Sequence, residues 1–105
     1  MAVIYYFCFG VEPTKEHPEF WRVQAGWAHV FFRRPEGNYE QEARAMVEAM
    51  KWTIQTLQIA RATDESHLAA LPQDIQQALR QKDDYVEFSA YETGGGSDQA
   101  GNPFA

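Results

Sequence analysis

Residues 25–34 read AGWAHVFFRR, and the stretch divides into two alternating sets of side chains, as a β-strand requires. Successive side chains of a strand point to opposite faces of its sheet. One face would hold an apolar set that should meet packed helices, namely Ala28, Val30 and Phe32. The other face would hold a largely aromatic set, Trp27, His29, Phe31 and Arg33. The stretch therefore predicts a strand with apolar or aromatic side chains on both faces.

The two other clear strands show the same surplus of aromatic side chains. Residues 2–10, AVIYYFCFG, predict a strand that is apolar on both faces and ends at Gly10. Residues 11–19 contain two prolines and several charges, so we expect a loop there. Residues 85–92, YVEFSAYE, predict a last strand with Val86, Phe88 and Ala90 toward the helices. Its other face would carry Tyr85, Glu87, Ser89 and Tyr91.

Two segments have the spacing of amphipathic helices. The first predicts a helix over about residues 39–51, with apolar positions at Tyr39, Ala43, Met46, Val47 and Met50. The second predicts a short helical turn and then a helix from about residue 72 to 82, with apolar positions at Leu68, Leu71, Ile75 and Leu79. Pro72 suits the first turn of that helix.

Residues 52–63, WTIQTLQIARAT, allow two interpretations. Ile54 and Leu57 continue the preceding helical stripe, which would give one long helix over 39–61 and the order β-β-α-α-β. The stretch is rich in β-branched residues, however, and a helix of about 24 residues is long for a small domain. A third strand is therefore favoured, although no glycine or proline marks a break after Lys51.

These elements predict an α+β domain over residues 1–93, with the order β-β-α-β-α-β. The natural arrangement is a ferredoxin-like one, in which a four-stranded sheet has two helices packed on one face. Residues 94–105, GGGSDQAGNPFA, are expected to form a flexible C-terminal tail.

An aromatic second sheet face is the most informative expectation about function. A sheet that helices cover on one side usually has polar residues on the other, and exposed apolar patches mark interfaces. Residues 11–24 or the tail could cover this face, a second copy could pair with it, or a different partner or ligand could bind there. The predicted partner-binding residues are Trp27, His29, Phe31, Tyr85, Glu87 and Tyr91.

Composition narrows the classes of function. The chain has 105 residues and a net charge of −6, which argues against nucleic acid as a partner and is compatible with a basic protein. The single cysteine, Cys8, cannot form an internal disulfide, so we expect a reducing, cytoplasmic compartment. The opening residues lack the pattern of a signal peptide and are too few to span a bilayer, so no membrane association is expected.

Few side chains suggest chemistry. Cys8 in an apolar strand is best explained as a small core residue. His29 and Glu87 would share a face and form the one acid–base pair that the strands allow. His17 and His67 lack a second histidine at metal-ligand spacing. We therefore expect no catalytic residues, no metal and no cofactor.

The run AGWAHVFFRRPEGNYEQEARAMVEAMKWTIQTL, followed by the closing YVEFSAY, resembles small uncharacterised bacterial α+β proteins of immunity-protein type. The resemblance covers about residues 25–92 and implies a bacterial, cytosolic binding protein without catalytic residues. The leading hypothesis is a non-enzymatic protein-binding module of immunity or inhibitor type, acting through the aromatic sheet face or through acidic loops. The alternatives are a small dimeric ferredoxin-like enzyme or ligand-binding protein with an aromatic pocket around His29, and a structural subunit that forms a homodimer through its sheet.

Overall fold

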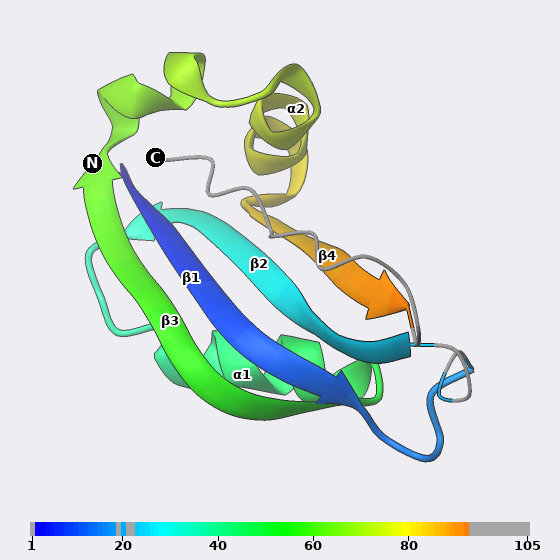
Figure 1. Ribbon diagram of the computed structural model, residues 1–105. Helices are drawn as coiled ribbons and strands as arrows, with labels where there is room; N and C mark the ends of the chain where they lie inside the picture. Colours follow the sequence, from blue (N-terminus) through cyan, green and yellow to red (C-terminus); the bar gives the residue numbers. More distant parts are fainter. Residues whose placement is uncertain (1, 19, 21–22, 93–105) are drawn as a thin grey trace.

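The computed structural model describes residues 2–18, 20 and 23–92, and for residues 24 and 90–92 it describes the backbone alone. The elements in chain order are β1 (Ala2–Pro13), β2 (Val23–Pro35), α1 (Glu40–Ala49), β3 (Trp52–Asp64), the 3-10 helix η1 (Glu65–Ala70), α2 (Gln73–Lys82) and β4 (Asp84–Glu92) (Figure 1). The tail expected over residues 94–105 lies outside the described residues.

The four strands form one antiparallel sheet in the order β3-β1-β2-β4. The α+β class and the four-stranded sheet with its helices are therefore confirmed. The strand order differs from that of a ferredoxin-like fold. The two long hairpin strands β1 and β2 form the centre of the sheet, and β3 and β4 form its two edges.

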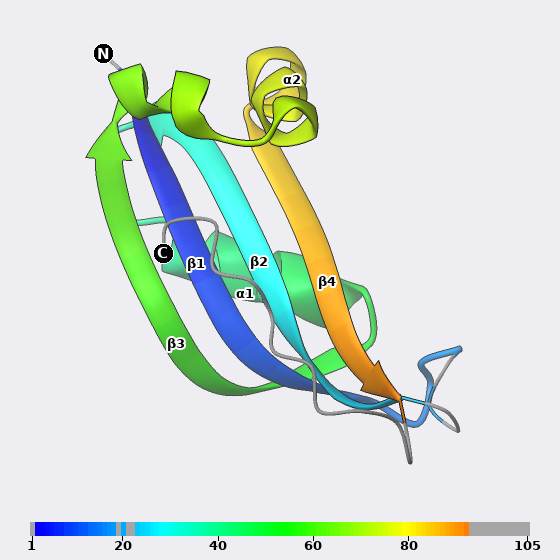
Figure 2. The same ribbon diagram turned by 45° about the horizontal axis from the view of Figure 1, so that its top comes forward.

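The helices lie on opposite faces of the sheet, which corrects the expectation that both pack on one face. Figure 2 shows α1 behind the sheet, with η1 and α2 in front of it. The reason is the first strand, which is apolar on both sides. Tyr5, Phe7 and Phe9 pack in one core with Ala43 and Val47 of α1. The intervening residues of β1 face the other way and join a second core with β2, η1 and α2. This core consists of Ile4, Tyr6, Cys8, Phe31, Leu68, Leu71, Ile75 and Leu79.

Residues 52–63 lie in a strand, as favoured, and the alternative of a single helix over 39–61 is wrong. Helix α1 ends at Ala49, and Lys51 adopts a left-handed backbone with φ of 71°. The amide of Met50 donates to the carbonyl of Val47 at 3.1 Å, which closes the last turn. Left-handed backbone is common at this position but usually falls on glycine. Because a lysine occupies this position instead of a glycine, the sequence gives no signal that the helix ends here.

The first strand is longer than expected. Val11, Glu12 and Pro13 continue β1 and pair with Ile54, Thr53 and Trp52 of β3. The prediction of a loop beginning at residue 11 is therefore wrong at these three positions. Val11 is buried beside the α1 core, so its side chain favours the strand despite the proline that follows closely.

The expected division of β2 into two faces is confirmed. Ala28, Val30 and Phe32 lie in the core under α1, and Phe31 lies in the core under α2. In β4, Val86 and Phe88 pack against the α1 core as predicted, whereas the side chain of Ala90 is outside the described part. Within that part, the helices are all too short or too polar to cross a membrane.

Candidate functional site

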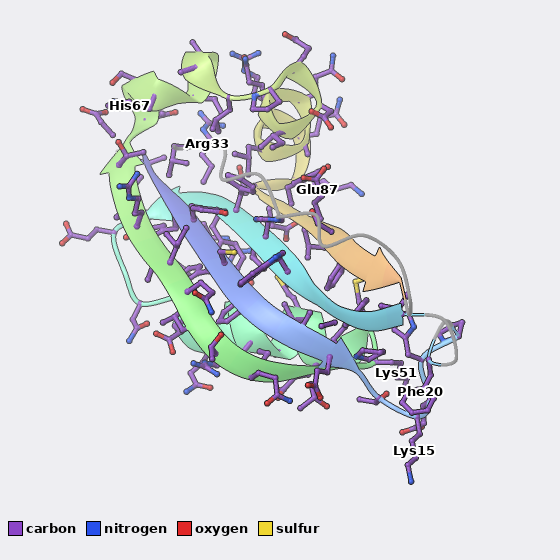
Figure 3. The ribbon with its side chains drawn as sticks, viewed as in Figure 1. Lys15, Phe20, Arg33, Lys51, His67 and Glu87 are labelled. Atoms are coloured by element: carbon purple, nitrogen blue, oxygen red, sulfur yellow. The ribbon has the colours of Figure 1, made fainter. Side chains whose placement is uncertain are left out.

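Five of the predicted partner-binding residues do lie on one face, the face that carries α2. The register of β2 with β4 places His29 opposite Glu87 and Phe31 opposite Tyr85. Glu87 projects from β4 on the side of α2 (Figure 3). The side chain of Tyr91 lies outside the described residues, although its backbone pairs with Ala25.

This face is less open than the sequence suggested, because η1 and α2 cover part of it. Phe31 is 0% exposed and His29 is 3% exposed, so neither side chain lies on the surface. Trp27 and Tyr85 are half-buried at the margin of the α2 core, and Glu87 is exposed. The expectation that His29 and Phe31 lie on an open face of the sheet is therefore wrong, because both side chains belong to the core.

The polar centre of this core is a pair formed by Tyr6 and His29. The Tyr6 hydroxyl lies 2.8 Å from His29 Nδ1, and the two rings are nearly parallel with centroids 6.0 Å apart. With the imidazole proton on Nε2, the hydroxyl donates to Nδ1. The Tyr6 ring also stacks on Phe31 at 4.8 Å, and its hydroxyl bonds the Cys8 thiol. The Tyr6 hydroxyl and His29 Nδ1 thereby satisfy each other inside an apolar layer.

Burial controls the ionisation of all three groups. It lowers the pKa of His29, an effect that the negative charge of Glu87 opposes. It raises the pKa of Tyr6, with Cys8 as a further cause, and it raises the pKa of Cys8, an effect that the hydrogen bond between Cys8 and Tyr6 opposes. Each shift favours the neutral form near pH 7. A thiol with a raised pKa is a poor nucleophile, so the cluster is best explained as a structural hydrogen-bond network.

The lowered pKa of His29 predicts how folding depends on pH. Unfolded histidine titrates near 6.5, so below about pH 6.5 the unfolded chain binds a proton that folded His29 resists. The stabilising contribution is complete above this pH and is lost as the pH falls toward the lower folded pKa. Urea unfolding measured between about pH 7.5 and 5.5 should therefore show a falling free energy of unfolding.

The control for this prediction is the choice of histidine. His29→Gln should flatten the pH dependence over this window, whereas His67→Gln, at an exposed position of η1, should preserve it. Equal pH dependence in the wild type and in His29→Gln would contradict the assignment.

A groove of about 420 Å³ lies between α2 and β4. Most of the residues that line it have polar or charged side chains, and the lining consists of Asp74, Gln77, Ala78, Gln81, Lys82, Asp84, Tyr85 and Val86. The Tyr85 hydroxyl donates to Glu87 at 3.1 Å, and burial, followed by this bond, raises the pKa of Tyr85 to about 12. Trp27, His29 and Phe31 do not line the groove, so it is not the aromatic pocket that the sequence suggested.

Several carboxylates near the end of the sheet that carries η1 are paired with arginines. Arg33 lies beneath η1 (Figure 3), and its Nε donates to Glu65 at 2.9 Å. This bond is the main reason why the pKa of Glu65 is lowered. Arg34 donates to Glu42 at 2.7 Å, which raises the pKa of the guanidinium. These acidic groups are therefore partly neutralised within the chain.

The free edge of β3, meaning residues 52–62 on the side away from β1, is a surface that the sequence analysis missed. Over the described residues β3 pairs with β1 alone. From Trp52 to Ala60 the strand contains no charged residue, and Leu57 is 38% exposed. Natural edge strands are usually protected by charges, because their unpaired backbone groups recruit other strands. The charge-free run WTIQTLQIA is the sequence signal for this edge. It could not be used, because the same residues also fit the continuation of a helix.

Two bulges shape this edge. Relative to β1, one extra residue lies between Ile54 and Thr56, and a second lies between Leu57 and Ile59. Gly10 of β1 faces the region between them. A Cβ atom at Gly10 would lie 2.7 Å from the Thr56 hydroxyl and 3.5 Å from the Trp27 ring, so the glycine permits close packing there. The central part of the edge is thus held against the sheet in a defined geometry.

Comparisons with known proteins place the chain in no family. No family model matches it, and neither a curated protein nor a solved structure does.

Proposed function

We propose that the protein is a non-enzymatic protein-binding module whose contact element is the free edge of β3. The observation that carries this proposal is a 13-residue edge strand that contains no charged residue from Trp52 to Ala60. An unpaired edge of this composition is a ready template for strand addition, in which main-chain hydrogen bonds supply affinity.

The alternating side chains of the edge favour a strand as the partner. Leu57 offers an exposed apolar contact, and Thr56, Gln55 and Gln58 offer polar contacts beside it. Segments with high β propensity, low charge and no proline aggregate when they are left open. A partner that pairs with β3 would remove this hazard and complete the sheet.

The aromatic face contributes less than the sequence suggested, because His29 and Phe31 are buried. Trp27, Tyr85 and Glu87 remain at the margin of that face as secondary candidates. The immunity or inhibitor class stays a prediction. The net charge of −6 would favour a basic partner within that class.

Leu57→Lys tests the proposal directly, because it places a charge at the centre of the edge without disturbing a buried side chain. The measurement is affinity capture from cells of the native host with the tagged full chain. We expect the Leu57→Lys variant to recover at least about tenfold less partner than the wild type. Gln77→Lys is the matched control, since it adds the same charge on the exposed surface of α2 and should leave recovery unchanged.

Hydrogen exchange of the captured complex completes this test. The amides of β3 should be slower to exchange in the complex than in the isolated Leu57→Lys chain. Recovery that is equal for the wild type and Leu57→Lys, with β3 unprotected in the complex, would refute the edge as the contact element.

A further inference from the structure

We infer that the occupant of the free edge is a second copy of this chain, whose β3 pairs antiparallel with β3 about a two-fold axis at Leu57. This inference rests on the proposed function, because it names the partner of the same edge. The resulting dimer would have one continuous sheet across both copies. Two observations support it, the order of side-chain faces along β3 and the position of its charges.

The assignment of β3 side chains to the two sheet faces is symmetric about Leu57. On the face of α1 lie the residues that pair with alternate core positions of β1, namely Ile54, Leu57, Ala60 and Ala62, together with Trp52, which itself belongs to the α1 core. The remaining residues lie on the face of α2. Gln58 belongs there because its amide donates to the Thr56 hydroxyl at 2.6 Å, and Gln55 because its amide donates to Glu12 at 3.4 Å.

This order selects one register for a two-fold pair. With Leu57 on the axis, Ile54 lies opposite Ala60, Trp52 opposite Ala62, and Thr53 opposite Arg61, and both members of each pair share a face. A shift of one residue places side chains of opposite faces against each other, which strand pairing does not tolerate where one face is apolar. The two bulges lie on either side of Leu57, so they preserve the match instead of breaking it.

Charge supports the same register. Arg61 is the one charged residue between Trp52 and Thr63, it is exposed, and it forms no ion pair with any residue that the structure describes. In the dimer Arg61 faces Thr53 of the second copy. Thr53 pairs in turn with Glu12 of β1, which is exposed on the same face. Two long side chains can meet over the short threonine between them, and the symmetry produces this contact twice.

A charge swap tests the register. Light scattering and sedimentation equilibrium of the wild type should show a dimer, with twice the chain mass of 12.0 kDa. Arg61→Glu and Glu12→Arg should each weaken dimerisation by about threefold to tenfold, since each replaces two attractions with two repulsions. The double variant Glu12→Arg/Arg61→Glu should restore the wild-type dissociation constant. Gln77→Lys should leave it unchanged.

Leu57→Lys distinguishes the inference from the proposed function. Two ammonium groups would meet on the axis, so this variant should be monomeric where the wild type is dimeric. A wild type that is monomeric at every concentration overturns the second copy as occupant, and so does a dimer that Leu57→Lys leaves intact. The proposed function survives either result if capture of another protein still depends on Leu57, and it fails with the inference if capture does not.

Discussion

Phe31→Ala should lower the free energy of unfolding by about 3–5 kcal/mol, because it removes a large ring from a core that cannot collapse around the loss. Phe31 is fully buried, stacks on Tyr6 at 4.8 Å and lies 6.2 Å from Tyr85. Leu68, Ile75 and other residues of η1 and α2 cover it from the second layer. An interface residue would instead weaken binding and leave folding nearly unchanged.

Urea unfolding followed by tryptophan fluorescence measures this effect, with Phe20→Ala as the control. Phe20 is 45% exposed and lies at the end of the sheet away from η1 (Figure 3). Removing its ring should therefore change the free energy of unfolding by no more than about 0.5 kcal/mol. Equal costs for the two variants would mean that α2 does not pack on this face.

Tyr6→Phe should cost about 1–3 kcal/mol, although it removes a single oxygen atom. The phenyl ring keeps the stack on Phe31, but His29 Nδ1 loses its partner at 2.8 Å and is left buried. An unsatisfied buried polar group costs more than the hydrogen bond itself contributes. The effect should be measured at pH 7.5, where the imidazole is neutral.

A double-mutant cycle separates this cost from simple loss of packing. The variant Tyr6→Phe/His29→Leu removes both polar groups, so it should be less destabilised than the sum of the two single variants. Strict additivity would show that the Tyr6–His29 bond does not form.

The sequence predicted most elements, because alternation and helical spacing are local signals. AGWAHVFFRR and YVEFSAYE form strands as expected, and the two amphipathic segments form α1 and α2. The break after Lys51 was not visible, since the left-handed turn is made by a lysine with no glycine nearby. Local patterns carry little information where tertiary packing decides a turn.

Local sequence patterns could not predict which face of the sheet each helix covers. Both faces of β1 are apolar, and this fact alone allows either an exposed patch or a helix on each side. The structure takes the second solution, so His29 and Phe31 lie in a core instead of at an interface. The position of β3 at an edge depends on strand order, which requires long-range pairings that no periodicity encodes.

Amide hydrogen exchange along β3, measured residue by residue by NMR, tests the central claim most directly. If the free edge is the contact element, amides of both alternating sets in Thr53–Ala62 should be protected in the wild type. In Leu57→Lys the set directed away from β1 should exchange much faster, and in Gln77→Lys it should not. Fast exchange of that set in the wild type under all conditions, alone and with host extract, would contradict the account.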